Sequence, residues 1–510
     1  MGARSYHRCE DCKATFLDPV HFLDADNERA EYEQHQNLPG DPGYARFLSQ
    51  VAQPLLARLP PHSSGLDYGC GPGPVLAQML REAGHTVALY DPFFHPDTSP
   101  LQTRHDFITC TEVIEHFHAP AQEFRRLDAL LQPGGWLALM TCFQTDDARF
   151  AQWHYRRDPT HVVFYREATF RRIAQRFGWR CEIPCKDVVL LVPGLTASSD
   201  MFIMPEHRNL TQVLLDEGFT DVWTLDGRIS KRQPYNHTRH RFTVDDVALY
   251  DNPAALDVVR RAVGPQARIH IISHCLGALS VAMSLFGKAI EGVRSVIVNG
   301  VSLTPKVGTF AKAKLAAGPF LAESVLGVDY LNPEWGQQAG IAPGKLLAKG
   351  VSLMHRECDV PECHMTSFMW GYGYPVLFRH ENLHEVTHRR TGDLFGGSGV
   401  HYYRHIRKMV SANNTAVKFD PKDVRYRQLP DNYLQDAADI STPMLLVAGQ
   451  ENALFLDSNV LCHTRLEQIA PGRHQLEVIP GYGHADVIIG KNAAHDVFPR
   501  FLKFLRQHAH

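Results

Sequence analysis

The stretch Ile269-His270-Ile271-Ile272-Ser273-His274-Cys275-Leu276-Gly277-Ala278 decides how the second half of this 510-residue chain is interpreted. Its first half is a short apolar run typical of a buried strand, and the small residues after it predict a sharp turn into a helix. Cys275 stands at the turn, with Ser273 and Gly277 two residues away on either side. A nucleophile is presented on such a strained elbow in G-x-S-x-G sequences, and here sulfur replaces oxygen. The alternative is a buried structural cysteine in an ordinary strand-to-helix turn.

Length and composition describe a chain of two or three ordinary globular domains. At 510 residues, 44% hydrophobic and 21% charged, it is too long for a single core. A net charge of −3 gives no electrostatic reason to expect a nucleic-acid partner. No apolar run approaches the roughly 20 residues of a membrane span. The N-terminus lacks an apolar signal segment and the 11 cysteines are scattered, so we expect a cytoplasmic protein.

A glycine-rich loop marks the first half of the chain. The run Gly65-Leu66-Asp67-Tyr68-Gly69-Cys70-Gly71-Pro72-Gly73 ends an expected strand and opens a helix over 75–83. Alternate glycines let a ligand approach the backbone closely. The G-x-G-x-G spacing differs from the G-x-G-x-x-G of dinucleotide sites, although an NAD-type domain remains the alternative. The next strand, over 86–90, ends at Asp91, where a carboxylate would take the ribose hydroxyls of a nucleoside cofactor.

The alternation of strands and helices continues after Asp91. We expect strands over 107–110 and 136–140, separated by a helix over 121–131. This order, over about residues 40 to 190, resembles the class I S-adenosylmethionine (SAM)-dependent methyltransferases. The resemblance implies a set of SAM-binding residues, with Asp91 on the ribose: Asp67, Gly69, Gly71, Gly73, Asp91 and Glu112.

The motif Glu112-x-x-Glu115-His116 brings two carboxylates and an imidazole close together in sequence. These groups suit a divalent cation, and quinone-biosynthesis O-methyltransferases have a similar motif followed by a later Thr-His such as Thr160-His161. A metal at Glu112, Glu115, His116 and His161 would lower the pKa of a substrate hydroxyl. Without a metal, His116 or His161 would serve as a general base or a substrate contact.

At the N-terminus, Cys9 and Cys12 with His7 look like half of a zinc knuckle. A closed structural zinc site needs four ligands, and no second C-x-x-C follows at the spacing of a zinc ribbon. We therefore interpret this pair as part of a turn.

A second series of strands and helices begins near residue 188. The expected strands cover 188–192, 222–225, 293–299, 444–448 and 476–479. The turn Pro193-Gly194-Leu195-Thr196 follows the first strand. In an elbow-type hydrolase, an N–H of this loop and the N–H after the nucleophile form the oxyanion hole. This pattern assigns Leu195 or Thr196, together with Leu276, to that role.

His484 follows the last expected strand and is the candidate base, because the order along such a fold is nucleophile, acid, histidine. The usual position of the acid is occupied by Asn452. An asparagine can orient an imidazole, and Glu451 and Asp457 are the nearby carboxylates. A thiolate–imidazolium ion pair would lessen the need for a third group.

The stretch from about 188 to 506 resembles the esterase-like α/β-hydrolase domain attached to cholesterol-oxidase-type flavoproteins. The matching segments are Leu195-Thr196-Ala197, Asp200-Met201-Phe202-Ile203-Met204, His274-Cys275-Leu276-Gly277, His355-Arg356-Glu357-Cys358-Asp359-Val360-Pro361 and Gly481-Tyr482-Gly483-His484. No flavin-binding glycine motif occurs in the chain, so the oxidoreductase half is absent from it.

About 140 residues separate the strands near 298 and 444, too many for a connection, so we expect a cap. Its aromatic and sulfur-containing residues suit a bulky apolar or acyl substrate, and they equally suit a core of the cap itself. They are Phe320, Tyr330, Trp335, Phe368, Met369, Trp370, Tyr372 and Tyr374. His355-x-x-Cys358 and Cys363-His364 could bind zinc, but packing is the interpretation that we prefer.

The sequence thus predicts an α/β chain of two doubly wound domains. A Rossmann-like SAM methyltransferase over 41–186 follows an N-terminal extension over 1–40, and an α/β-hydrolase covers 187–510 with a cap at about 301–440. Both sheets require the strand over 188–192, and we expect it in the hydrolase sheet because it is central there.

We expect methyl transfer to an oxygen or nitrogen of a small molecule, and ester or thioester hydrolysis by Cys275 with His484. The alternatives for the second domain are an acyltransferase or polyester-synthase activity, or an inactive binding module. The expected cofactors are SAM and, in the metal hypothesis, a divalent cation. The expected partners are small apolar or acyl molecules, with neither nucleic acid nor a membrane span. The sequence leaves open both substrates, the coupling of the two reactions and the oligomeric state.

Overall fold

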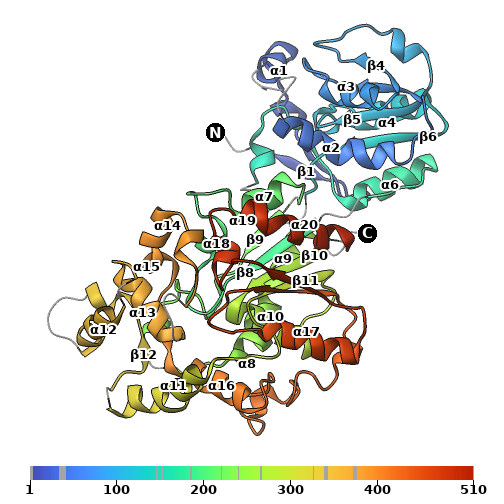
Figure 1. Ribbon diagram of the computed structural model, residues 1–510. Helices are drawn as coiled ribbons and strands as arrows, with labels where there is room; N and C mark the ends of the chain where they lie inside the picture. Colours follow the sequence, from blue (N-terminus) through green and yellow to red (C-terminus); the bar gives the residue numbers. More distant parts are fainter. Residues whose placement is uncertain are drawn as a thin grey trace. The chain divides into compact units, whose positions relative to one another are not determined.

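The computed structural model divides the chain into two compact units, Met1–Cys185 and Lys186–His510 (Figure 1). The residues that the structure describes are 4–33, 42–144, 147–150, 153–183, 187–219, 221–238, 240–264, 267–325, 327–337, 343–355, 357–371 and 376–508. Within these ranges, no helix combines the length and the apolar character needed to cross a membrane.

The N-terminal unit is built on a four-stranded parallel sheet with the order β4-β3-β5-β6. Its strands are β3 (Ser64–Tyr68), β4 (Thr86–Tyr90), β5 (His105–Thr111) and β6 (Leu131–Met140). Its main helices are α2 (Pro42–Leu56), α3 (Val75–Glu82), α4 (Pro120–Leu130) and α6 (Glu167–Phe177). The strand order reverses between β3 and β5, and open α/β sheets bind ligands at the carboxyl ends of strands beside such a reversal.

Two apolar clusters cover the two faces of this sheet. Successive residues of a strand point to opposite faces, so Phe107 of β5 packs with α2 and α3 while Ile108 packs with α4. The first cluster contains Leu48 of α2 and Leu80 of α3, and the second contains Leu127 of α4. Both faces are therefore buried, as parallel sheets require.

A small antiparallel sheet with the order β1-β2-β7 completes this unit. Its strands are β1 (Tyr6–Arg8), β2 (Thr15–Leu17) and β7 (Val163–Phe164), and α1 (Ala25–Tyr32) follows the hairpin. Cys9 and Cys12 lie in the hairpin turn, where the Cys12 N–H points at the Cys9 sulfur at 3.5 Å. Lys13 closes the turn with φ of 63°.

The C-terminal unit contains a six-stranded parallel sheet with the order β15-β14-β11-β10-β8-β9. The strands are β8 (Asp187–Val192), β9 (Asp221–Thr224), β10 (Arg268–His274), β11 (Ser295–Asn299), β14 (Met444–Gly449) and β15 (Gln475–Ile479). The helices beside it include α7 (Leu210–Asp216), α8 (Val244–Asp246), α9 (Asn252–Val263), α10 (Cys275–Phe286), α17 (Ser458–Ile469), α18 (Asp486–Ile489), α19 (Ala493–Asp496) and α20 (Phe498–Gln507).

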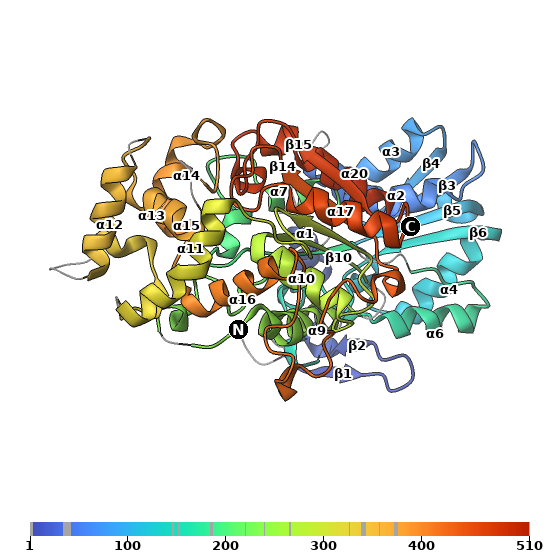
Figure 2. The same ribbon diagram turned by 60° about the horizontal axis from the view of Figure 1, so that its bottom comes forward.

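The direction of winding distributes these helices over both faces of the sheet. The chain moves from β8 outward to β9 through α7, and from β10 in the opposite direction to β11 through α10. Because parallel crossovers are right-handed, α7 and α10 must lie on opposite faces. Figures 1 and 2 show α20 beside α7 on one face and α10 on the other.

The strand predicted over 188–192, which both expected sheets required, is β8 and lies in the six-stranded sheet, as predicted. β8 pairs with β10 through residues 187–192 and with β9 through 188–191. Val188–Val192 are buried throughout, because an interior strand of a parallel sheet packs on both faces. In the part of the N-terminal unit that is described, the sheet ends at β6. Residues 184–186, where the expected methyltransferase hairpin would turn, lie outside the described residues.

The cap is inserted between β11 and β14 and is drawn in yellow and orange in Figure 1. It contains α11 (Thr309–Phe320), α12 (Pro343–Met354), α13 (Pro361–Trp370), α14 (Glu385–Arg389), α15 (Thr391–Leu394), α16 (Val400–Ser411), and the paired strands β12 (Tyr330–Leu331) and β13 (Ser398–Gly399). Trp335 packs in a separate core within the cap, together with Tyr330 and Phe368. Phe320 is 63% exposed. Tyr372 and Tyr374 lie outside the described residues.

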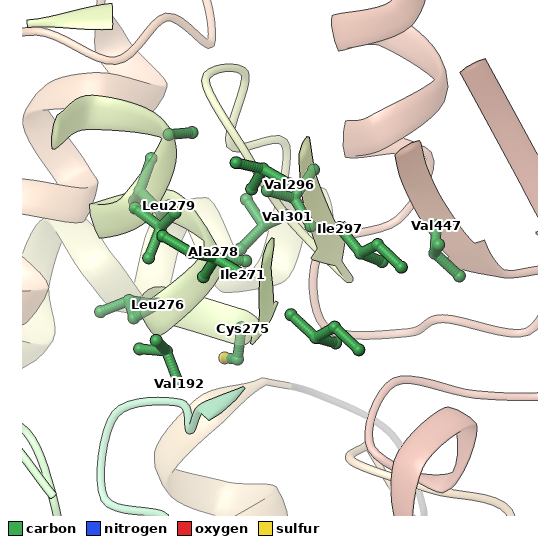
Figure 3. Packing of buried hydrophobic residues seen from close by; sticks show 14 of the residues in the cluster. Val192, Ile271, Cys275, Leu276, Ala278, Leu279, Val296, Ile297, Val301 and Val447 are labelled. Carbon is green, nitrogen blue, oxygen red and sulfur yellow. The ribbon is translucent and has the colours of Figure 1, made fainter. Parts of the chain in front are cut away.

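The elbow itself depends on two glycines at the crossing of the β8 and β10 loops. A β-carbon on Gly277 would lie 2.1 Å from the carbonyl oxygen of Pro193. A β-carbon on Gly194 would lie 2.7 Å from the β-carbon of Cys275. Cys275 has φ of 55°, the strained left-handed conformation of a strand-to-helix elbow. Figure 3 shows Cys275 at this junction, next to Val192 and Leu276.

We expect Gly277→Ala to lower the free energy of unfolding by roughly 1–3 kcal/mol, because the backbone must shift to admit the methyl group. Gly350→Ala in α12 is the matched control. Nothing lies within 4 Å of its added β-carbon, so the same change should stabilise the helix by about 0.5–1 kcal/mol. Alkylation of the buried Cys462 in α17 during urea unfolding measures the stability of this unit. Equal stabilities of Gly277→Ala and the wild type would contradict the close approach.

Candidate active sites

The thiol of Cys275 lies at the N-terminus of α10, near a backbone N–H group of that helix and one of the loop after β8. The N–H groups of Leu276 and Leu195 both face the sulfur closely enough to lower the pKa of the thiol. The N–H of Thr196 donates instead to the carbonyl of Ile229 at 2.7 Å. Of the two loop residues expected from the sequence, Leu195 is therefore the one whose amide faces the thiol.

A narrow and mainly apolar cavity lies over this thiol, which is 7% exposed. Its volume of about 10 Å³ is close to the space that one water molecule needs. The cavity is lined by Gly194, Leu195, Ala197, His274, Cys275, Trp370, Leu377, Phe395, Leu454 and His484. Of the cap aromatics named from the sequence, Trp370 is among the residues that line this cavity, and it stacks on Tyr403 with 5.1 Å between the ring centroids.

Two imidazoles lie beside the thiol. The sulfur of Cys275 and one nitrogen each from His274 and His484 lie within 4.8 Å of one another. His484 is fully buried, and among the described residues neither of its ring nitrogens has a hydrogen-bond partner. Packing holds its ring instead: a β-carbon on Gly300, whose φ is 89°, would lie 2.5 Å from the ring. His274 was missed from the sequence, although its position directly before Cys275 at a strand end was the available signal.

The residues expected to orient His484 have other partners. The Asn452 side chain accepts hydrogen bonds from the N–H groups of Leu454 and Phe455 and donates to the carbonyl of Gly300 at 3.4 Å. Asp457 pairs with Lys306 at 2.7 Å. The Glu451 carboxylate lies 3.8 Å from the guanidinium of Arg379. The contact between Asn452 and the His484 ring is thus indirect: Asn452 binds the carbonyl of Gly300, and the ring packs on Gly300.

Burial favours the neutral forms of the Cys275 thiol and the His484 imidazole. Burial raises the pKa of Cys275 to about 12, against the opposing effect of the Leu276 and Leu195 amides. Burial, and then the neighbouring His274, hold the pKa of His484 well below its usual range. A preformed thiolate–imidazolium pair, which the sequence had suggested, is therefore disfavoured in this cavity. If Cys275 acts as a nucleophile, its proton would therefore have to pass from sulfur to nitrogen during attack.

In the N-terminal unit, the glycine loop follows β3 at the carboxyl edge of the sheet. Gly69 and Gly71 have φ of 77° and 64°, and the space beside Gly71 is open. The Gly71 N–H donates to a carboxylate oxygen of Asp91 at 3.0 Å, which joins the loop to the end of β4. Asp67 is buried and accepts from the hydroxyl of Thr109 at 2.8 Å, and burial raises the pKa of Asp67 to about 6.

Glu112 and Glu115 follow β5 at the same edge and share a tyrosine. Glu112 has φ of 52°, and the Tyr155 hydroxyl lies 3.1 Å from its carboxylate and is also hydrogen-bonded to Glu115. Burial raises the pKa of both carboxyl groups, and the charge of Glu112 raises that of Glu115 further. Tyr155 was missed because it lies 40 residues after Glu115, in a short 3-10 turn.

Three of the four expected metal ligands converge. Ligand atoms of Glu115, His116 and His161 lie within 4.8 Å of one another, and Glu112 is outside this group. The Nδ1 atoms of both histidines contact carbonyl oxygens, of Thr160 at 3.1 Å and of Tyr155 at 2.7 Å. A carbonyl only accepts, so Nδ1 carries a proton in each ring, and in the neutral form of each ring the lone pair is on Nε2. Tyr32 of α1 packs against His116 with 5.2 Å between the ring centroids.

The solved structures most similar to this chain include lipases and esterases. A monoacylglycerol lipase of Paleococcus ferrophilus is 14% identical, with a TM-score of 0.38 over 65% of this chain and 98% of that one. A thermostable carboxyl esterase of Bacillus coagulans is 13% identical, with a TM-score of 0.39 over 65% and 93%.

Comparison with protein families and curated proteins identifies both units. A probable lipase of Schizosaccharomyces pombe is 21% identical over 340 residues, which are 64% of this chain and 71% of that protein. A methyltransferase domain matches residues 42–182, and the alpha/beta hydrolase family matches residues 189–497. The second match spans more than half of the sequence, and the chain therefore belongs to the alpha/beta hydrolase family and carries a methyltransferase domain before its hydrolase domain.

Proposed function

We propose that this chain is a bifunctional enzyme, which transfers a methyl group from SAM to a small molecule and hydrolyses an ester or thioester through Cys275. The observation that carries the hydrolytic part is the thiol on an elbow, beside His484 and beneath the amides of Leu195 and Leu276. The methyltransferase match carries the other part, together with the glycine loop and Asp91 at the reversal of strand order.

The loop residues fit the SAM cofactor. Open space beside Gly71 lets a ligand approach the backbone, and the carboxylate of Asp91 lies directly beside it. Asp91 already accepts from the N–H groups of Gly71, Phe93 and Phe94, which fix its orientation. A carboxylate has about four acceptor sites, so one remains for a ribose hydroxyl. When bound, SAM supplies an electrophilic methyl group; Asp67, Gly69 and Gly73 complete its proposed contacts.

We expect Asp91→Ala to weaken SAM binding by roughly 10- to 100-fold, because a hydrogen bond to a charged group contributes about 1.5–3 kcal/mol. Isothermal titration calorimetry with SAM measures the change. Asp106→Ala is the matched control, since its carboxylate accepts from the Ser64 N–H at the opposite edge of the sheet. Failure of the wild type to bind SAM would overturn the proposed cofactor.

Glu115, His116 and His161 are our proposed ligands for a divalent cation. The Oε2 atom of Glu115 is buried and has no hydrogen-bond partner among the described residues. Hydrogen bonds from Nδ1 of each histidine to a carbonyl are the usual support for imidazole ligands. When bound, a cation lowers the pKa of a substrate hydroxyl and prepares it for methylation. If no cation binds, His116 or His161 remains as a general base.

Manganese(II) titrated into the protein should bind to the wild type and not to Glu115→Gln or His161→Ala. The reason is that each variant removes one of only three protein ligands. Electron paramagnetic resonance of free manganese measures the bound fraction. His118→Ala, whose ring stacks on Phe22 outside the group, should bind as the wild type does. Undiminished binding in His161→Ala would refute the ligand set.

The hydrolytic reaction requires only groups that face the cavity. The substrate carbonyl lies above Cys275 with its oxygen toward the N–H groups of Leu195 and Leu276, which stabilise the developing oxyanion. As sulfur bonds to the carbonyl carbon, its proton passes to His484; the same proton then protonates the leaving oxygen or sulfur as that bond breaks. Water then gives a proton to His484 as its oxygen bonds to the acyl carbon; the C–S bond breaks, the acid is released, and the proton returns from His484 to the sulfur.

The cavity walls favour an apolar acyl group. Leu195, Trp370, Leu377, Phe395 and Leu454 contribute side chains, and the cap supplies Trp370, Leu377 and Phe395. The lipase name of the yeast relative and the resemblance to esterase-like domains of cholesterol-oxidase-type flavoproteins support an ester substrate. Since the cavity has space for about one water molecule, the cap must move to admit a substrate.

An acyltransferase is the second candidate, because the mainly apolar walls around the thiol would disfavour water beside an acyl-cysteine. In that case the acyl-cysteine would pass its acyl group to an alcohol or thiol. Product analysis of an ester incubated with and without added alcohol separates the two activities.

The rate at which a p-nitrophenyl ester acylates Cys275 should not depend on pH over a wide interval. This interval runs from the lowered pKa of His484 to the pKa of about 12 of Cys275. Over that interval the histidine is an unprotonated base and the thiol keeps its proton, so the reacting form does not change. His484→Ala should be slower by on the order of 10²- to 10⁴-fold. Its rate should rise with pH, because only the thiolate then reacts. Stopped-flow release of p-nitrophenolate measures both profiles.

Two controls accompany the acylation experiment. Cys275→Ala should lose the labelled peptide, and Asn452→Ala should cost less than His484→Ala because Asn452 acts through Gly300. Labelling that persists in Cys275→Ala would leave this unit as a binding module. A wild-type rate that rises steadily with pH would exclude His484 as the base.

A further inference from the structure

Four side chains of the cap converge on one point that lies outside the Cys275 cavity. Ligand atoms of Cys358, Cys363, His380 and His388 all lie within 4.8 Å of one another. They come from three places in the chain: the loop before α13, the first turn of α13, and the segment formed by a 3-10 turn (His380–Asn382) and α14. Residues this far apart in sequence meet only because the cap folds them together.

A sulfur-to-nitrogen distance within this group matches the one expected around a tetrahedral zinc ion. With Zn–S of about 2.3 Å and Zn–N of about 2.0 Å, tetrahedral geometry separates sulfur and nitrogen ligands by roughly 3.5 Å. The Cys363 sulfur and His380 Nε2 are 3.5 Å apart. The rings of His380 and His388 have centroids 4.4 Å apart, and one nitrogen of each lies within 4.8 Å of the two sulfurs.

Two observations indicate that a ligand is needed at this point. The Nε2 atom of His388 is buried and has no hydrogen-bond partner in the part of the chain that is described. A buried nitrogen without a partner costs free energy that binding to a cation would recover. Both cysteines are free thiols, and two thiolates would neutralise the charge of one divalent cation.

His364 is close to this group but has a different role. Its Nδ1 contacts the Ser352 hydroxyl at 3.1 Å, and its Nε2 contacts the carbonyl oxygen of Cys358 at 3.0 Å and the Cys358 sulfur at 3.3 Å. The Nε2 proton therefore points at Cys358, as an outer hydrogen bond to a metal-bound sulfur does. His355 contacts the carboxylate of Glu357 at 3.0 Å. The ligand set that the sequence suggested, with His355 and His364, is thus replaced by one with His380 and His388.

We propose that Cys358, Cys363, His380 and His388 bind a structural zinc ion in the cap. Two sulfur and two imidazole ligands complete the tetrahedral coordination of zinc and leave no position for a substrate, so the ion holds structure and performs no chemistry. A mixed thiolate and imidazole set also excludes magnesium and calcium, which take oxygen ligands.

The ion would connect the cap to the turn that carries His484. His380 lies between Arg379, whose N–H points at the Asp486 carboxylate at 3.4 Å, and Asn382, whose side chain donates to Asp486 at 2.6 Å. Upstream, the carbonyl of Leu377 accepts from the N–H of Ala485 at 2.6 Å. Cys363 lies on α13, and Trp370 at the end of that helix lines the cavity over Cys275. The proposed zinc would therefore link the segment that contains Leu377 to helix α13, which ends at Trp370, and both residues line the cavity.

The full chain, purified without added metal or chelator, should contain zinc that is lost in specific variants. Inductively coupled plasma mass spectrometry measures the zinc content per chain. Cys363→Ser and His380→Ala should each lose one ion relative to the wild type. His401→Ala is the matched control, since its ring packs on Phe419 elsewhere in the cap and lies outside the group of four ligands. Cys9→Ser and Glu115→Gln should also keep this ion, which separates it from metal bound elsewhere on the chain.

Cobalt(II) replaces zinc in the second measurement, which needs no variant that might misfold. After the zinc has been removed, the wild type reconstituted with cobalt should show a sulfur-to-cobalt charge-transfer band and the intense visible bands of tetrahedral cobalt. The absence of the charge-transfer band would overturn the proposal. So would zinc retained in Cys363→Ser, or a Cys358–Cys363 disulfide found by peptide mapping of the native protein.

Discussion

The close approach of two loops at the elbow is the constraint on which the hydrolase unit depends. Gly277 lies so near the Pro193 carbonyl, and Gly194 so near Cys275, that neither position admits a β-carbon. This crossing brings the Leu195 amide to the same sulfur that the first turn of α10 already faces. The cost is the left-handed backbone of Cys275, which the surrounding parallel sheet is rigid enough to hold.

The proposed dyad of Cys275 and His484 differs from a catalytic triad in how its histidine is held. A charged orienter would raise the basicity of the imidazole, whereas His484 is positioned by contact with Gly300 and Phe455 and lies beside a second imidazole, His274. Burial then favours the uncharged forms of both thiol and base. In the proposed hydrolysis, the oxyanion that develops on the substrate would therefore be stabilised by the two amides while the proton leaves the thiol.

The sequence predicted the features that depend on a local pattern of residues. It did not predict the contacts that depend on how distant segments pack together. Both sheets could be predicted from apolar runs and glycine turns, and β8 could be assigned because Val188–Val192 have no polar face. The third partner of His484 could not be assigned, because proximity to the ring depends on how the Asn452 turn packs. Tyr155 and the pair His380 and His388 lie far in sequence from the groups that they meet, and no spacing rule joins them.

The order of the strands along the chain has a consequence for how the C-terminal unit forms during synthesis. β8 emerges first, but its partner β10 follows only after the whole of β9 and α9, and β14 joins β11 only after the entire cap. Contacts of such long sequence separation form slowly, since the entropy of closing each intervening segment is lost before the pairing stabilises it. Until the cap has been translated, the apolar edge of β11 remains exposed, and a nascent chain halted there presents a strand to which other chains can add.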